Sequence, residues 1–146
     1  TRTEAAARMA QFLVLGAATG LERFYYYAWD NRHSGMVTSH GERLPAYDAM
    51  AQVQTWLIGS RIKGCASPGQ GKVVCQVESG KQAFLIAWAN QSGAQSLKLP
   101  NGMKVSGVET LLSTTPAPAY QAQRGFVRIA LGSEPVRIML HRQELP

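Results

Sequence analysis

Residues 23–29 read Arg-Phe-Tyr-Tyr-Tyr-Ala-Trp, and this run decides how the fold is interpreted. It is too aromatic for an exposed helix, and it suits a strand that is buried on both faces, as in a parallel sheet. Alternation along such a strand places Tyr25, Tyr27 and Trp29 on one side and Tyr26 on the other. The neighbouring segments are therefore interpreted around a buried strand over residues 24–29.

A helix is expected on each side of this strand. Residues 3–15 hold almost only good helix formers, with apolar side chains at helical spacing. A polar loop covers residues 30–44, and a second helix begins at Pro45, a residue suited to the first helical position, and runs to residue 58. Helix, strand and helix make an αβα unit, which cannot close a core without further parallel strands.

The composition changes near residue 60, where short alternating runs replace the helical pattern. Turn-forming residues separate these runs, as expected for strands joined by tight connections. The expected strands cover residues 61–65, 73–78, 83–89, 96–99, 104–111, 126–131 and 136–141. About seven short strands of this kind predict an antiparallel β-sandwich, so we divide the chain into residues 1–60 and residues 61–146.

Composition and charge bound the function classes. The 146 residues are 45% hydrophobic and 16% charged, which is ordinary for a globular protein, and no apolar run is long enough to span a bilayer. The whole net charge of +6 lies in residues 61–146, which contain ten Lys and Arg residues and only four acidic residues. These cations are spread along the chain without a run and without interleaved stacking aromatics, so nucleic-acid binding is not expected.

Two cysteines, Cys65 and Cys75, flank a turn-rich stretch. If the flanking segments pair as a hairpin, the side chains come within bridging distance, which would suit an oxidising compartment. Two buried free thiols are an equal alternative. A zinc site is not expected, because no further Cys or His lies at ligand spacing.

Several short motifs together resemble a known pattern. They are FYYYAWD at residues 24–30, the glycines Gly35 and Gly41, PAYDAM at residues 45–50, and WLIG at residues 56–59. The pattern is similar to the end of the catalytic barrel in clan A glycoside hydrolases, especially relatives of family 39 that act on exopolysaccharides. Residues 83–88 and 132–136 look like a strand and the closing hairpin of the β-sandwich that follows such a barrel.

The resemblance implies an α+β composite: the last αβα unit of a (β/α)8 barrel, followed by an antiparallel β-sandwich. Residues 3–15, 24–29 and 45–58 would be the seventh helix, eighth strand and eighth helix. Active sites of this fold lie at the carboxyl ends of the strands, so the residues after the strand would face the substrate cleft. The substrate implied is a polysaccharide, and exopolysaccharide processing would suit a periplasmic or secreted protein.

Catalytic residues are not expected in this chain. Glycoside hydrolysis uses two carboxylates, and the resemblance implies glutamates after the fourth and seventh strands, upstream of this sequence. Glu4 and Glu22 are expected at the end of the strand away from the cleft, and Asp30 alone cannot supply a pair. We therefore expect an inactive fragment without a cofactor, whose partner is the upstream barrel segment, in the same or a separate chain.

Substrate contact is expected from the end of the predicted strand and the loop after it. The indole of Trp29 would cover a sugar ring while its N–H donates a hydrogen bond, and Asp30 would accept bonds from hydroxyls or else cap a turn. Tyr25 and Tyr27 share the side of Trp29. His33 would order the loop or touch substrate. Trp56 and Trp88 are interpreted as packing residues between the two segments.

A second function class competes with the enzyme fragment. A noncatalytic carbohydrate-binding or structural β-sandwich module would present exposed aromatic residues on one sandwich face. Residues 61–146 offer few aromatic side chains for such a face: Phe84, Trp88, Tyr120 and Phe126.

Overall fold

The structure, a computed structural model, describes residues 1–31, 35–69 and 71–143, which hold two helices and eight strands. The helices are α1 (Arg2–Ala18) and α2 (Pro45–Leu57). The strands are β1 (Arg61–Ala66), β2 (Lys72–Ser79), β3 (Gln82–Ala89), β4 (Gly93–Lys98), β5 (Met103–Thr110), β6 (Tyr120–Gln123), β7 (Phe126–Leu131) and β8 (Val136–Arg142). Both predicted helices and the seven predicted strands of residues 61–146 are present, and β6 is additional.

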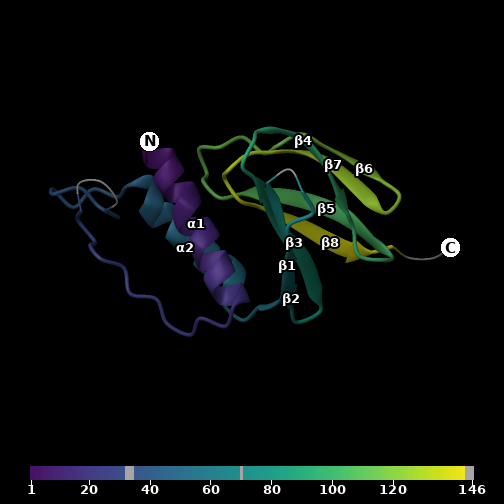
Figure 1. The fold of residues 1–146 in the computed structure, drawn as a ribbon, viewed down its shortest axis with the longest axis horizontal. Helices are drawn as coiled ribbons and strands as arrows, with labels where there is room; N and C mark the ends of the chain where they lie inside the picture. The colour runs from purple at the N-terminus through teal and green to yellow at the C-terminus, as the bar shows by residue number, and fades with distance from the viewer. Residues whose placement is uncertain (32–34, 70, 144–146) are drawn as a thin grey trace.

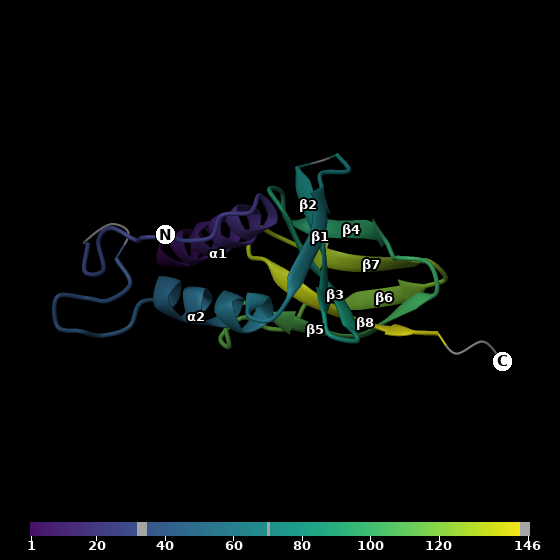
Figure 2. The same ribbon diagram turned by 90° about the horizontal axis from the view of Figure 1, so that it is seen from below.

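The two helices lie side by side and run in the same direction (Figures 1 and 2). A capping box of Thr1 and Glu4 begins α1. Pro45 is the first residue of α2, where its missing N–H costs no hydrogen bond. Neither helix in the described residues is long and apolar enough to cross a membrane.

The strands form two antiparallel sheets. One has five strands in the order β1-β2-β3-β8-β5, and the other has three in the order β4-β7-β6. Residues of β7 alternate between exposed and buried, because one face of the small sheet packs inward and the other meets solvent. We refer to the two sheets together as the paired sheets.

The chain is arranged in three layers: the helices, the five-stranded sheet and the three-stranded sheet (Figure 2). The central strand β3 shows this order residue by residue. Phe84, Ile86 and Trp88 belong to the core cluster shared with the helices. Leu85, Ala87 and Ala89 belong to the cluster between the sheets. The strand is therefore buried on both faces, although its sheet is antiparallel.

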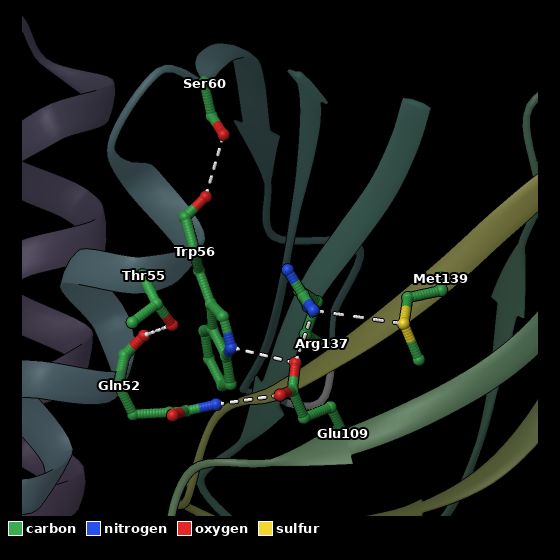
Figure 3. Close-up of polar contacts among 7 residues, drawn as sticks. All are labelled: Gln52, Thr55, Trp56, Ser60, Glu109, Arg137 and Met139. Carbon is green, nitrogen blue, oxygen red and sulfur yellow. Dashed lines mark hydrogen bonds and ion pairs between the residues drawn. The ribbon is translucent and has the colours of Figure 1, made fainter. Parts of the chain in front are cut away.

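Polar side chains also join α2 to the large sheet (Figure 3). The indole Nε1 of Trp56 donates to Oε2 of Glu109 at 3.1 Å, and Gln52 donates to Oε1 of the same carboxylate at 3.0 Å. The guanidinium of Arg137 lies 2.6 Å from Oε2 of Glu109. One carboxylate thus links a helix to β5 and β8, while Trp56 itself is buried in the core.

Cys65 and Cys75 form a disulfide between β1 and β2. The two residues are directly opposite each other in the register of these strands, with their Cα atoms 4.0 Å apart. Of the two alternatives left open by the sequence, the structure contains the bridge.

Residues 24–29 form no strand, so the predicted strand buried on both faces is wrong for this chain as the structure has it. The described residues offer no neighbouring strand to which this segment could bond, and its backbone runs extended outside both sheets. Half of its side chains consequently face solvent rather than a sheet on either side.

Candidate functional site

The aromatic segment after α1 lies against the helices on the side away from the sheets. Phe24 and Tyr26 pack in a small cluster with Met9, Met36 and Ala46. The ring of Phe24 lies 5.1 Å from that of Phe12 and 6.0 Å from that of Tyr26. The inward-facing rings therefore anchor the segment to the helices.

The alternate side chains of the segment point outward. Tyr25 is 82% exposed and Tyr27 is 92% exposed. The sequence prediction that Tyr25 and Tyr27 share a side opposite Tyr26 agrees with this exposure pattern. Two neighbouring phenol rings in solvent make an aromatic surface that the rest of the described chain does not cover.

Trp29 extends this surface but is held more firmly. Its backbone carbonyl accepts hydrogen bonds from the N–H groups of Met36 and Val37, at 2.7 and 3.1 Å. Its ring meets that of Tyr47 edge to face, with centroids 5.5 Å apart. With 47% of its surface exposed, Trp29 keeps part of its indole available for a ligand.

Arg43 and Tyr47 are members of this surface that the sequence interpretation did not assign. The guanidinium carbon of Arg43 lies 4.5 Å from the centre of the Tyr47 ring, a cation–π arrangement. No local pattern pairs them in the sequence, because Arg43 belongs to the loop before α2 and Tyr47 to the first turn of that helix. The indole of Trp29, the phenol ring of Tyr47 and the guanidinium of Arg43 therefore pack one against the next.

The loop after Trp29 is shaped by local hydrogen bonds. The N–H of Gly35 donates to the carbonyl of Asn31 at 2.7 Å, and a Cβ at position 35 would lie 2.4 Å from that oxygen. Only glycine fits there. Further along, the hydroxyl of Thr38 accepts from the N–H groups of His40 and Glu42, and Gly41 takes a positive φ of 81°. These contacts hold a tight turn beside the aromatic surface.

The remaining predicted site residues fall in different places. Asp30 is exposed and directly follows Trp29. His33 lies outside the described residues. Glu22 is near the carboxyl end of α2, where it lines a small hollow with Leu57 and Ile58.

Glu4 corrects the sequence interpretation. It was expected at the end away from the cleft, but α1 begins on the side of the molecule where residues 35–44 lie (Figure 1). The packing of Met9 against Met36 of that loop gives the same placement. The error arose because residues 24–29 run in the direction opposite to α1. The start of α1 is therefore at the same end of the unit as Trp29, where that segment ends.

The geometry of this surface suits binding rather than bond cleavage. Aromatic faces, a guanidinium and a free carboxylate can stack on a sugar ring and bond its hydroxyls. In the part of the chain that the structure describes, no group of three or more His, Cys, Asp and Glu is placed to hold a metal ion.

No protein-family profile matches this sequence, and no curated protein matches it. Solved structures do match. A family 39 glycoside hydrolase from the gut symbiont Bacteroides cellulosilyticus WH2 superposes with a TM-score of 0.71 and 16% identity, over 93% of this chain and 30% of that one. A GH30 endoxylanase from Clostridium papyrosolvens C71 gives a TM-score of 0.63 and 18% identity, over 94% of this chain and 38% of that one.

An Anoxybacillus α-amylase matches more distantly, with a TM-score of 0.54 and 12% identity, over 95% of this chain and 33% of that one. The chain thus spans about a third of the length of these enzymes. Its fold is similar to part of family 39 and family 30 glycoside hydrolases, which agrees with the resemblance found in the sequence motifs.

Proposed function

We propose that the chain is the C-terminal part of a glycoside hydrolase that acts on a polysaccharide. In this proposal residues 1–60 are the last αβα unit of a (β/α)8 barrel and residues 61–146 are a β-sandwich that braces it. The catalytic carboxylates belong to the upstream segment, and this chain alone is inactive. The supporting observation is that one match to a family 39 enzyme extends over the helices and the paired sheets together.

The arrangement of residues 1–57 supports the barrel part of the proposal. Two helices that run in the same direction, connected by a segment that brings the chain back to the end where the first helix begins, have the geometry of a βα-repeat. The returning segment carries outward aromatic side chains, and none of the strands in the described part of the chain lies beside it. In this proposal, parallel strands from an upstream segment lie beside residues 24–29 and complete a sheet there, with Trp29 at its carboxyl end.

The contacts between helices and sheets support the bracing role. The shared cluster contains Val14, Val53 and Trp56 of the helices, with Phe84 and Trp88 of the large sheet. Glu109 adds hydrogen bonds across the same boundary. A helix pair fixed in this way cannot shift relative to the sheets without breaking a buried core.

Substrate contact is assigned in this proposal to Trp29, Asp30, Tyr25 and Tyr27, and the sequence-based assignment of His33, which lies outside the described residues, is kept as part of it. Trp29 is at the end of the segment that becomes the eighth strand, the position that lines the cleft in such barrels. Its partly exposed indole and the adjacent carboxylate are the groups that sugars need. An exopolysaccharide substrate and a periplasmic or secreted location are part of the proposal, and the Cys65–Cys75 disulfide favours an oxidising compartment.

The competing function, a noncatalytic carbohydrate-binding or structural module, needs an aromatic face on the sheets. Phe84 and Trp88 are buried, which removes them from such a face. Tyr120 is paired with the inward-facing Ile129, whereas Phe126 is on the outer side of β7. The two exposed rings are therefore on different faces, and they form no common platform.

The proposal is tested by identifying the polypeptide that contains this sequence in its natural source. Peptides of the chain are traced by mass spectrometry, and the mass of the intact polypeptide and of its native complex is measured. We expect a polypeptide or complex larger than the 15.9 kDa of the chain by about the size of a barrel. A monomer of 15.9 kDa with no accompanying polypeptide contradicts the proposal, as does glycan turnover by the isolated chain.

A further inference from the structure

The two sheets differ in width, and this leaves part of the large sheet uncovered. β4 is an edge of the small sheet, and the large sheet continues past it through β2 and β1. A groove of about 730 Å³ lies along this overhang, with β4 on one side and Gln76 and Lys72 of β2 on the other. The side-chain amine of Lys72 crosses it and donates to the backbone carbonyl of Ser96 at 3.2 Å.

The groove continues around the end of the paired sheets. A second hollow of about 610 Å³ shares Lys98, Asn101 and Phe126 with the first. It reaches the turn between β6 and β7 and the end of β8. Five cations distant in sequence line the two hollows: Lys63, Lys72, Lys98, Arg124 and Arg142. We call the two hollows together the basic groove.

Few negative charges oppose these cations. Among the described residues that line the basic groove, none is Asp or Glu. Lys63 pairs with Glu78 at 3.6 Å in an exposed contact, a type that contributes little. Of the described carboxylates, none contacts Lys98, Arg124 or Arg142. The fold therefore gathers five of the ten Lys and Arg residues of positions 61–146 along the groove, where their charge is available to an anion.

We propose that the basic groove binds a carboxylated stretch of a polysaccharide, as an ionic subsite separate from the aromatic surface around Trp29. The cations match carboxylates placed at intervals along a sugar chain, and the amides of Gln76 and Asn101 suit its hydroxyls. Phe126, 46% exposed and shared by both hollows, offers a ring face to one sugar. The choice of a sugar polymer rests on the proposed function.

The aromatic content of the groove favours a polysaccharide over a single-stranded nucleic acid. Nucleic-acid channels combine positive charge with several rings on which successive bases stack. Phe126 is the one aromatic side chain among the described groove-lining residues. A sugar polymer needs fewer rings, because its hydroxyls and carboxylates supply most of the contacts.

The test measures binding of oligogalacturonate to the full chain by calorimetry at low and at physiological salt, with a neutral cellodextrin of equal length for comparison. We expect oligogalacturonate to bind at low salt and to weaken about tenfold at physiological salt, because screening shortens the range of the field. The double variant Lys98→Glu with Arg142→Glu should lose about tenfold in affinity at low salt. Phe126→Ala should also weaken binding, without any change of charge.

The matched control is Lys104→Glu with Arg128→Glu, which changes the net charge equally at exposed positions outside both hollows. Binding close to that of the unaltered chain supports the groove, whereas an equal loss shows attraction to net charge and overturns it. Tighter binding of a single-stranded oligonucleotide of equal charge, or no binding of oligogalacturonate at low salt, also overturns it. None of these outcomes alters the size of the polypeptide in the natural source, so the proposed function is tested independently.

Discussion

Trp29 is held through its backbone carbonyl and through its ring, while part of the ring remains in solvent. Backbone N–H groups bind its carbonyl, and its ring makes an edge-to-face contact with Tyr47. The ring of Tyr47 is itself held by the guanidinium of Arg43. A ring that is already ordered loses little conformational entropy when a ligand stacks on it. This rigidity distinguishes Trp29 from the neighbouring Tyr27, which is almost fully exposed.

Under the proposed function, Trp29→Ala should lower kcat/KM of the full enzyme on its polysaccharide about tenfold, equivalent to about 1.4 kcal/mol of lost binding in the transition state. Steady-state kinetics with the polysaccharide check this. Tyr120→Ala, which removes an exposed ring from the paired sheets, is the matched control and should leave kcat/KM unchanged. Equal activity of the Trp29 variant and the control would rule out the assigned role.

Glu109 is the second residue with a clear consequence. Because its carboxylate receives bonds from Trp56, Gln52 and Arg137, Glu109→Ala should lower the free energy of unfolding by about 2 kcal/mol. Glu109→Gln keeps an acceptor but removes the charge, so its loss should be smaller, about 1 kcal/mol. Urea denaturation followed by far-UV circular dichroism measures both. A stability equal to that of the unaltered protein for the alanine variant would show that these bonds do not contribute.

At the scale of elements, the disulfide joins two strands that are already paired in register. It closes a short loop, so the chain-entropy estimate gives a stabilisation of about 2–3 kcal/mol. Reduction by dithiothreitol should lower the urea midpoint accordingly. The double variant Cys65→Ala with Cys75→Ala should start at a lower midpoint and not respond to the reductant. A midpoint that falls equally in both proteins would mean that the reductant acts elsewhere.

The sequence was informative where an element's own pattern decides its structure. Pro45 marks the start of α2, and alternation along residues 126–131 identifies β7. β6 was missed because all four of its residues are exposed, so it shows no apolar alternation. Residues 24–29 were misassigned for the opposite reason: their composition suits a buried strand, but hydrogen bonds with neighbouring strands, not composition, make a strand.

The candidate site was only partly predictable for a related reason. The exposure pattern of Tyr25 and Tyr27 follows from alternation, which is a local property. The contact between Trp29 and Tyr47 joins two elements through a loop whose shape depends on Gly35 and its neighbours. The basic groove gathers residues from β1 to the end of β8, and no local pattern indicates that they meet.

At the scale of the whole molecule, the uncovered aromatic surface should make the isolated chain self-associate. The exposed rings of Tyr25 and Tyr27 favour apolar contact with a second copy. Sedimentation velocity across a range of concentrations should therefore show reversible association, reduced in Tyr25→Ser with Tyr27→Ser. Tyr120→Ser serves as the control. Association that is unchanged in the double variant would locate the contact on another surface.

The shared core predicts how the molecule unfolds. Helices and sheets are buried against each other through Trp56 and Trp88, so neither part should be stable alone. We expect one cooperative transition, with coincident curves from helical circular dichroism and from tryptophan fluorescence. Residues 61–146 produced alone should aggregate, because Phe84, Ile86 and Trp88 lose their cover. Two separate transitions would show that the segments are independent domains.

Strand β3 separates two hydrophobic cores, because its successive side chains point alternately into one core and then the other. Substitutions at positions 84 and 86 change the core between the helices and the large sheet. Substitutions at positions 85 and 87 change the core between the two sheets. The residues of one core can therefore vary during evolution without compensating substitutions in the other core.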